Sequence, residues 1–334
     1  MAFPGAIAVW SGTQPRFETY RIPPHADGLV LGREIADPSD DRISRAHVRL
    51  TIEDDRVWIG DLNSRNGTFV EGDTLRERRT LTEPTVVRAG RSVFVVMPEI
   101  RPYEHVPISR RGSLVVGGTL DAACRVVDTA AVEAENLAIV GPRSVGLELA
   151  RSYAKALGGE YAVFDTAVPV SAENVISAAP KLRTLLLELG RRALLREDAL
   201  AICELLETDV RFVTRVQAEI DLANLPPSIA SRLTSRVLEL PKVRYDELPT
   251  TLHDIVCELA PSATIHATAI EMSLLMLRSL DEDRLLDQFR ADVRRWLDGG
   301  FEQARGLRGE HVFVATSNPA HWCLHGFEVP RRRR

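Results

Sequence analysis

Lysine is almost absent from this chain of 334 residues. Only Lys155, Lys181 and Lys242 are lysines among 42 basic side chains, and arginine supplies the rest. An arginine guanidinium is a planar fork of donors that matches a carboxylate or a phosphate, whereas a lysine ammonium is a point charge. The skew is typical of genome composition rather than of one function. Its consequence is that nearly every cation suits bidentate contact with an anion.

Paired cysteines, long apolar runs and a secretory leader are also lacking. The cysteines, Cys124, Cys203, Cys257 and Cys323, are dispersed without paired spacing, which argues against a disulfide framework. No apolar run reaches the roughly 18 residues that a membrane-spanning helix needs. The N-terminal residues show no basic leader followed by a cleavage pattern. We therefore expect a reduced, cytoplasmic protein without a membrane partner.

An excess of positive charge is missing as well. The net charge is -5, so no global field attracts the chain to nucleic acid. Hydrophobic residues make up 45% and charged residues 27% of the chain, which is ordinary for a soluble globular protein. The length is sufficient for two domains with separate cores.

The first part of the chain, residues 6–98, shows no sustained helical periodicity. Short apolar runs separated by turn residues lie at 6–10, 17–22, 28–31, 46–52, 56–61, 68–70, 85–87 and 92–97. Asp54-Asp55 is a candidate hairpin turn between two of them. Many short strands at close spacing predict an all-β sandwich.

The chain changes character after this part. Residues 99–113 contain two prolines and polar residues and are the expected linker. Strand-like runs then alternate with helical runs in residues 114–262, which predicts an α/β domain with a mainly parallel sheet. The last part, 263–330, is expected to be helical over about its first two thirds. The fold class is therefore multidomain.

Three polar clusters stand on the connections between the predicted strands. They are Gly32-Arg33, Ser44-Arg45-Ala46-His47 and Asn63-Ser64-Arg65-Asn66-Gly67-Thr68. A guanidinium and a hydroxyl donor suit a phosphothreonine, which carries about -1.5 to -2 charges and three acceptor oxygens. Asn66-Gly67 is a turn pair that tolerates positive φ. For a lone Gly-Arg pair an internal salt bridge would be the preferred interpretation, but the three clusters together favour phosphate capture.

In their order and spacing these clusters resemble a forkhead-associated (FHA) domain, over about residues 7–98. The resemblance implies a β-sandwich whose loops bind a phosphothreonine peptide. By this resemblance, Arg33 and Ser44 would contact the phosphate, with Arg45 beside them. Asn66 would contact the peptide backbone, and Arg65 would line the same edge. The residues implied to shape the loops are Gly32, His47, Gly67 and Thr68.

The second half resembles, over about residues 114–290, the AAA+ module of bacterial enhancer-binding transcription activators. In that family a Gly-rich loop ends in Gly-Lys-Glu-Leu, and Gly141 and Gly146 match its glycines. The lysine position, however, is Leu147. That lysine reaches the β- and γ-phosphates of the nucleotide, and an isobutyl group cannot replace its charge. A plain strand-to-helix turn is the alternative interpretation of this segment.

The second nucleotide motif is altered too. Glu188 falls on the magnesium-linked aspartate of the family, while the catalytic glutamate position is Leu189. Arg232 sits at an arginine position of the segment around the family's arginine finger. The loop that engages the sigma factor has no counterpart, and no segment resembles a DNA-binding helix-turn-helix. The resemblance thus implies a degenerate, catalytically silent module.

Two weaker signals lie near the C-terminus. His321, Cys323 and His325 alternate closely, but without a fourth nearby ligand a metal site is not expected. Residues 331–334 are four arginines, too short a run to predict nucleic-acid binding. We expect no cofactor and no catalytic residue.

The sequence as a whole predicts a signalling adaptor of bacterial type that is not an enzyme. Its expected partner is a threonine-phosphorylated protein, with a Ser/Thr kinase system upstream. Association with itself or with an intact AAA+ protein remains open. The alternatives are a phosphorylation-gated ATPase of the enhancer-binding type and a transcription regulator that acts through partners without hydrolysis.

Overall fold

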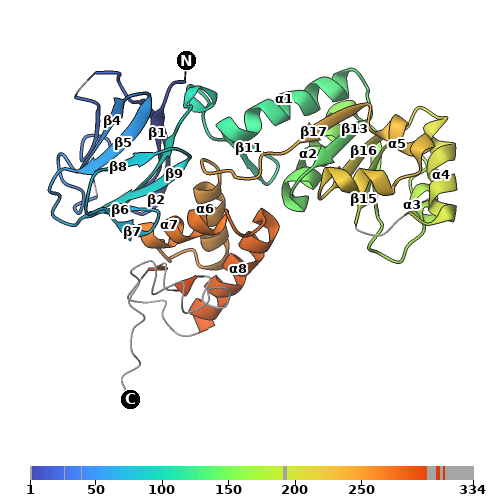
Figure 1. Ribbon diagram of the computed structural model, residues 1–334. Coiled ribbons are helices and arrows are strands. Elements are labelled where there is room, and N and C mark those ends of the chain that lie inside the picture. The colour runs from blue at the N-terminus through green and yellow to red at the C-terminus, as the bar shows by residue number, and fades with distance from the viewer. Residues whose placement is uncertain are drawn as a thin grey trace. The chain divides into compact units, whose positions relative to one another are not determined.

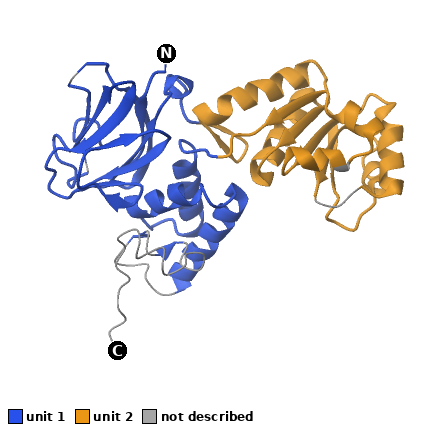
Figure 2. Cartoon of the chain, in the orientation of Figure 1, with its two compact units in different colours: residues 1–108, 243–334 blue, residues 109–242 orange. Residues whose placement is uncertain are grey.

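The computed structural model describes residues 2–25, 27–38, 40–190, 194–298, 306–308 and 311–312. They form two compact units, coloured separately in Figure 2. Unit 1 comprises residues 1–108 and 243–334, and unit 2 comprises residues 109–242. Unit 2 is therefore inserted in sequence between two parts of unit 1.

Unit 1 contains the predicted β-sandwich, which is confirmed. One sheet has six strands in the order β2 (Gln14–Arg21), β1 (Gly5–Ser11), β10 (Ser92–Met97), β9 (Thr85–Ala89), β6 (Thr68–Val70) and β7 (Asp73–Thr74). The other has four, in the order β3 (Leu29–Leu31), β4 (Val48–Glu53), β5 (Arg56–Asp61) and β8 (Arg79–Leu81). The strand pairs are antiparallel. The short strands β7 and β8 were not predicted, because their mostly polar residues, Asp73-Thr74 and Arg79-Thr80-Leu81, form no apolar run.

The β4–β5 hairpin decides where the polar clusters lie. Asp54 and Asp55 have φ of 48° and 59°, the left-handed conformation of a tight hairpin turn. At the other end of the hairpin, Val48 stands opposite Asp61. The first loop (residues 32–47) and the second loop (residues 62–67) therefore leave the sheet side by side.

The six-stranded sheet is buried on both faces. Its inner face joins the core between the two sheets. Its outer face, with Ile7, Val9, Val93 and Val95, packs on three helices. These are α6 (Leu248–Leu259), α7 (Ala267–Met276) and α8 (Glu282–Asp298), seen below the sandwich in Figure 1. Full burial of one such aliphatic side chain contributes about 1.5–3 kcal/mol, so the helices supply a large share of the stability of unit 1.

Ion pairs accompany this apolar packing. Arg88 on β9 lies 2.5 Å from the fully buried carboxylate of Glu271 on α7. Arg278, just after α7, lies 2.6 Å from Glu71. The resulting grouping differs from the expected boundaries, which placed residues 243–262 with the α/β domain. The physical reason is that α7 packs on β9, β10 and β1 and α6 packs on β2, while α8 packs on α6 in the same apolar core.

Unit 2 is an α/β domain with a parallel sheet, as predicted. The strand order is β14 (Glu160–Asp165), β15 (Leu182–Leu189), β16 (Arg211–Val216), β13 (Leu137–Val140) and β17 (Arg236–Glu239). Its helices are α1 (Gly118–Val132), α2 (Arg143–Leu157), α3 (Ala172–Ser177), α4 (Arg196–Leu206) and α5 (Pro227–Leu233), with a 3-10 turn at Glu219–Asn224. All neighbouring strands of this sheet run parallel.

The expected linker is partly structured. A 3-10 turn at Arg101–Tyr103 belongs to unit 1, and β11 (Ser109–Arg111) pairs with β12 (Leu114–Val116) in unit 2. Within the described ranges, no helix combines the length and the apolar character needed to cross a membrane.

Candidate functional site

A buried histidine ties the first loop to the second. The ring of His47 is fully buried; its Nδ1 accepts a hydrogen bond from the Ser44 amide at 3.0 Å, and its Nε2 lies 3.0 Å from the Gly67 carbonyl oxygen. Because Nδ1 is the acceptor, Nε2 carries the proton and donates to Gly67. His47 therefore lies inside the loops rather than on their surface.

Ser44 stands between the two loops. Its carbonyl oxygen accepts a hydrogen bond from the Arg33 amide at 3.1 Å, and its Oγ accepts one from the Arg65 amide at 3.3 Å. The hydroxyl proton of Ser44 is therefore free to be donated to a ligand oxygen. The Arg33 side chain donates from one terminal nitrogen to the Ile43 carbonyl at 3.1 Å, which leaves most of its five donors available.

The polar side chains of the three clusters gather at one exposed edge. Arg33, Arg45, Arg65 and Asn66 are all exposed. Asn66 donates from Nδ2 to the Arg42 carbonyl oxygen at 2.6 Å, so its amide is held against the first loop. The Arg33 guanidinium, the Asn66 amide and the Ser44 hydroxyl therefore lie at the junction of the loops, and Arg45 and Arg65 are exposed on the same two loops. This set of donors suits an anion.

Two glycines permit the close approach of the loops. A Cβ on Gly32 would lie 2.0 Å from the carbonyl oxygen of Arg45, which no side chain could tolerate. Gly67 has φ of 75°, a conformation that favours glycine, while the space around it is open. Gly32 is thus needed for packing, and Gly67 for backbone conformation.

Asp61 organises the second loop and was not among the predicted site residues. Its carboxylate accepts hydrogen bonds from the Ser64 amide at 2.8 Å, from the Ser64 hydroxyl at 2.7 Å and from the buried Thr68 hydroxyl. Burial acts to raise the pKa of Asp61, but the bonds from Ser64 and Thr68 outweigh it and hold the pKa below its ordinary value. The spacing of an aspartate three residues before a serine is a turn signal that could have identified it.

The glycine-rich segment of unit 2 has a different geometry from a phosphate-cradling loop. In such a loop, backbone N–H groups between strand and helix surround the phosphates. Here α2 begins at Arg143, two residues after Gly141, and the Gly146 amide bonds the Pro142 carbonyl as part of the helix. Leu147 consequently lies within α2.

A buried arginine, Arg215, lies near the carboxyl end of β16, the central strand of the sheet. Arg215 donates to the Glu188 carboxylate at 2.5 Å and, through Nη2 and Nε, to the Gly141 carbonyl at 2.6 and 3.1 Å. A Cβ on Gly146 would lie 2.8 Å from the Arg215 side chain, so the glycine makes room for it. Burial raises the pKa of Glu188, against the opposing effect of Arg215. The carboxylate expected at a magnesium site is therefore engaged by a guanidinium.

The remaining predicted positions of unit 2 are engaged locally. Arg232 on α5 pairs with Glu207 and donates to the Leu206 carbonyl. Leu189 is buried in the core beside β16. Within the described part of unit 2, the Arg232 guanidinium pairs with Glu207, whereas the Glu188 carboxylate pairs with Arg215.

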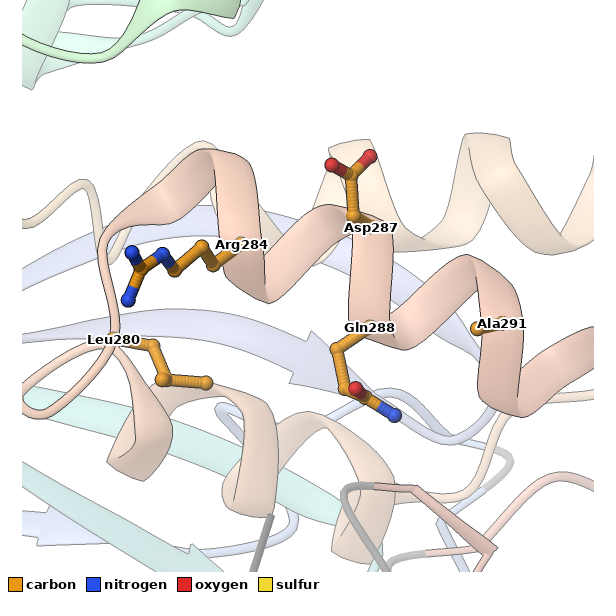
Figure 3. Close-up of a pocket in the computed structure, with 5 residues that line it drawn as sticks. All are labelled: Leu280, Arg284, Asp287, Gln288 and Ala291. Carbon is orange, nitrogen blue, oxygen red and sulfur yellow. The ribbon is translucent and has the colours of Figure 1, made fainter. Parts of the chain in front are cut away.

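Other candidate sites carry little chemistry. Figure 3 shows a pocket along α8, lined by Leu280, Arg284, Asp287, Gln288 and Ala291, in which Asp287 and Gln288 point in different directions. Among the described residues, no group of three or more His, Cys, Asp or Glu could hold a metal ion. The weak candidates His321, Cys323 and His325 and the arginine run 331–334 lie outside the described residues.

Comparisons with known proteins support the reading of the first part of the chain. The family model of the FHA domain matches residues 29–90, so the chain contains an FHA domain. No curated protein matches the chain. A solved FHA domain with phosphothreonine-dependent interactions is 23% identical and covers 29% of this chain and 96% of its own, with a TM-score of 0.25.

Two further solved structures match parts of the chain. The FHA domain of FhaA, in complex with the intracellular domain of Rv3910, is 24% identical; the match covers 28% of this chain and 98% of that chain, with a TM-score of 0.24. The RuvB Holliday junction branch migration motor of Thermotoga maritima is 18% identical; the match covers 61% of this chain and 67% of that chain, with a TM-score of 0.44.

Proposed function

We propose that this protein is a signalling adaptor whose FHA domain captures a phosphothreonine on a partner protein. The observation that carries the proposal is the convergence of Arg33, Ser44 and Asn66 at the junction of two loops locked by His47. A preorganised set of donors loses little conformational freedom on binding, which favours affinity. An upstream Ser/Thr kinase follows from the proposal, because the ligand must be phosphorylated.

Each side chain has a distinct role in this proposal. Arg33 and the Ser44 hydroxyl contact the phosphate, and Arg45 adds positive charge beside them. Charge-assisted hydrogen bonds to a phosphate are roughly twice as strong as neutral ones. Asn66 contacts the backbone of the bound peptide, and Arg65 lines the same edge. The phosphate supplies the affinity, and the backbone contact fixes the register of the peptide.

A retention experiment with the full chain tests the proposal. The immobilised protein is offered a pool of peptides with random residues around a central phosphothreonine, an identical phosphoserine pool and an unphosphorylated pool. We expect selective retention of phosphothreonine peptides, with recurring residues at one or more flanking positions. Equal retention of the unphosphorylated pool would refute phosphate capture.

We further propose that unit 2 does not hydrolyse nucleotide and serves protein contacts. Three features support this: Leu147 stands at the lysine position, α2 begins before the glycine-rich segment can form a loop, and Arg215 engages Glu188. An isobutyl group offers nothing to a triphosphate, and a carboxylate paired with arginine is a poor magnesium ligand. ATP turnover by the purified protein that disappears in a Glu188→Gln variant would contradict this proposal.

A further inference from the structure

The parallel sheet of unit 2 has an open edge at β14. In the strand order, β14 has β15 on one side and no strand among the described residues on the other. The Thr166 amide, directly after β14, donates to the Glu188 carbonyl of β15 at 3.1 Å, and the pairing is regular from Tyr161 to Asp165. Backbone groups point to alternate sides along a strand, so the N–H and C=O groups of Tyr161 and Val163 point away from β15. They are available to another strand.

The same two residues expose apolar side chains. Tyr161 is 46% exposed and Val163 is 39% exposed, whereas Phe164, on the other face of the strand, is buried in the core. Val163 stands beside Leu186 in register, and Leu186 packs with residues of α1 and α2. These helices therefore cover the inner strands on this face of the sheet and leave the side chains of β14 in contact with water.

This edge lacks the features that usually keep edge strands from pairing. Such features are lysines, prolines and bulges. Residues 161–165 contain neither lysine nor proline, and their one charged residue, Asp165, is engaged by Arg143 at 2.6 Å. The opposite edge of the sheet differs, because β17 carries the charged residues Arg236 and Glu239. The β14 edge is therefore the one suited to pairing with another strand.

We propose that β14 pairs in antiparallel orientation with β14 of a second copy of this chain, about a two-fold axis at Ala162. In this register Tyr161 lies opposite Val163 of the second copy, and Val163 lies opposite its Tyr161. The outward N–H and C=O groups of these residues then bond one another, and the two sheets become continuous. The inference rests on the proposed role of unit 2 in protein contacts and gives that role a definite partner.

The backbone and the side chains of β14 select this register. Outward groups meet only where residues 161 and 163 face each other or themselves. A pairing centred on Val163 would place Tyr161 opposite Asp165, and one centred on Tyr161 would leave Val163 opposite Gly159. The register centred on Ala162 instead forms an aromatic–β-branched pair twice, a combination that stabilises antiparallel sheets. Because the strand matches itself, one chain supplies both halves of a symmetric interface.

Sedimentation velocity of the full chain, from about 1 µM to about 1 mM, tests the pairing. We expect a reversible dimer. Val163→Lys brings two ammonium groups into the interface and should raise the dissociation constant at least tenfold, or about 1.4 kcal/mol. The matched control is Val237→Lys on β17, where the valine is 43% exposed, close to the 39% of Val163. The control should dimerise like the unchanged protein.

A cysteine at the axis tests the register without adding charge. In Ala162→Cys the new residue faces its own copy in a non-hydrogen-bonded pair, whose Cα atoms lie about 4.5 Å apart, within the range of a disulfide. Oxidised glutathione should convert this variant into a covalent dimer that a reducing agent separates. The unchanged protein, which carries only its own cysteines, and Val237→Cys should form no such dimer.

The outcomes separate this inference from the other proposals. A chain that is monomeric at every concentration would overturn self-pairing and leave the edge to a strand of another protein. A Val163→Lys variant that dimerises as well as Val237→Lys would overturn the role of β14. A dimer in which Ala162→Cys does not cross-link would overturn the register. ATP turnover would contradict the proposed lack of hydrolysis in unit 2 without bearing on the dimer, and retention of phosphothreonine peptides should be the same in both lysine variants.

Discussion

The Nδ1 atom of His47 accepts a hydrogen bond from the backbone amide of Ser44 at 3.0 Å. With its other ring nitrogen 3.0 Å from Gly67, the same imidazole connects the first loop to the second. The spacing of donors around the loop junction thus depends on a side chain that itself is fully buried. His47 is therefore a positioning residue: it holds the two loops in place, whereas exposed residues on those loops are the ones that can touch a ligand.

Replacement of His47 by alanine should weaken peptide binding without removing any ligand contact. The variant leaves the Ser44 amide and the Gly67 carbonyl without their partner, and a buried unsatisfied group costs about 1–3 kcal/mol. We expect faster amide hydrogen exchange in residues 62–68 and a roughly tenfold or greater loss of affinity for a phosphothreonine peptide. Unchanged exchange in that loop would show that His47 does not position it.

The carboxylate of Asp61 should make the second loop sensitive to acid. The pKa of Asp61 lies below the ordinary value of an aspartate, since the hydrogen bonds from Ser64 and Thr68 outweigh the effect of burial. A depressed pKa means that the stabilisation is fully present above the unfolded value of about 3.9 and is lost as the pH falls through the folded pKa. Amide exchange of the loop should accelerate below about pH 4. Asp61→Asn should remove this pH dependence of amide exchange in the second loop. If the pH dependence persisted in the variant, another titrating group would be its cause.

The buried pair of Arg88 and Glu271 should be needed for the docking of α7 on the sheet. Glu271→Ala leaves the guanidinium of Arg88 without its carboxylate, and removal of one partner of a buried pair costs about 3–5 kcal/mol. Arg88→Met/Glu271→Met should recover much of the loss, because it removes both charges. Thermal unfolding measures the effect, with Glu258→Ala, an exposed glutamate on α6, as the control. A Glu271→Ala variant as stable as this control would contradict the structural role of the pair.

The sequence predicted the sandwich and its loops better than it predicted the arrangement around them. Turn residues and short apolar runs located most strands, and Gly32, His47 and Gly67 lie in the loops between them. Strand β1 is apolar at nearly every position because both of its faces are buried. That pattern indicates that another element packs on the outer face of the sheet. Nothing near β1 in the sequence indicates that this element is the helix group α6–α8, which begins more than 200 residues later.

The role of Arg215 could not be predicted for a related reason. It lies in a largely buried strand, and its partners Glu188 and Gly141 are brought to it only by the parallel strand order. The sequence also does not indicate that α2 begins as early as Arg143, because the preceding Pro142 is compatible with a loop or with a helix N-terminus. Contacts between distant segments decide both features.

Restoring the missing lysine should not restore nucleotide hydrolysis. In Leu147→Lys the new ammonium stands within α2, and the Arg215 guanidinium still engages Glu188. We expect no ATP turnover above that of the unchanged protein and no thermal stabilisation by ATP with magnesium. ATP turnover by Leu147→Lys would show that the leucine alone had prevented hydrolysis at an otherwise competent nucleotide site.

The most direct test of phosphothreonine capture is a calorimetric titration of the full chain with one peptide in phosphorylated and unphosphorylated form. We expect binding of the phosphorylated form only, and a loss of at least tenfold in Arg33→Ala, because a charge-assisted contact is worth about 1.5–3 kcal/mol. Arg56→Ala, at the far end of the β4–β5 hairpin, should bind like the unchanged protein. Equal affinity for both peptides, or an Arg33→Ala variant that binds as well as Arg56→Ala, would contradict the account.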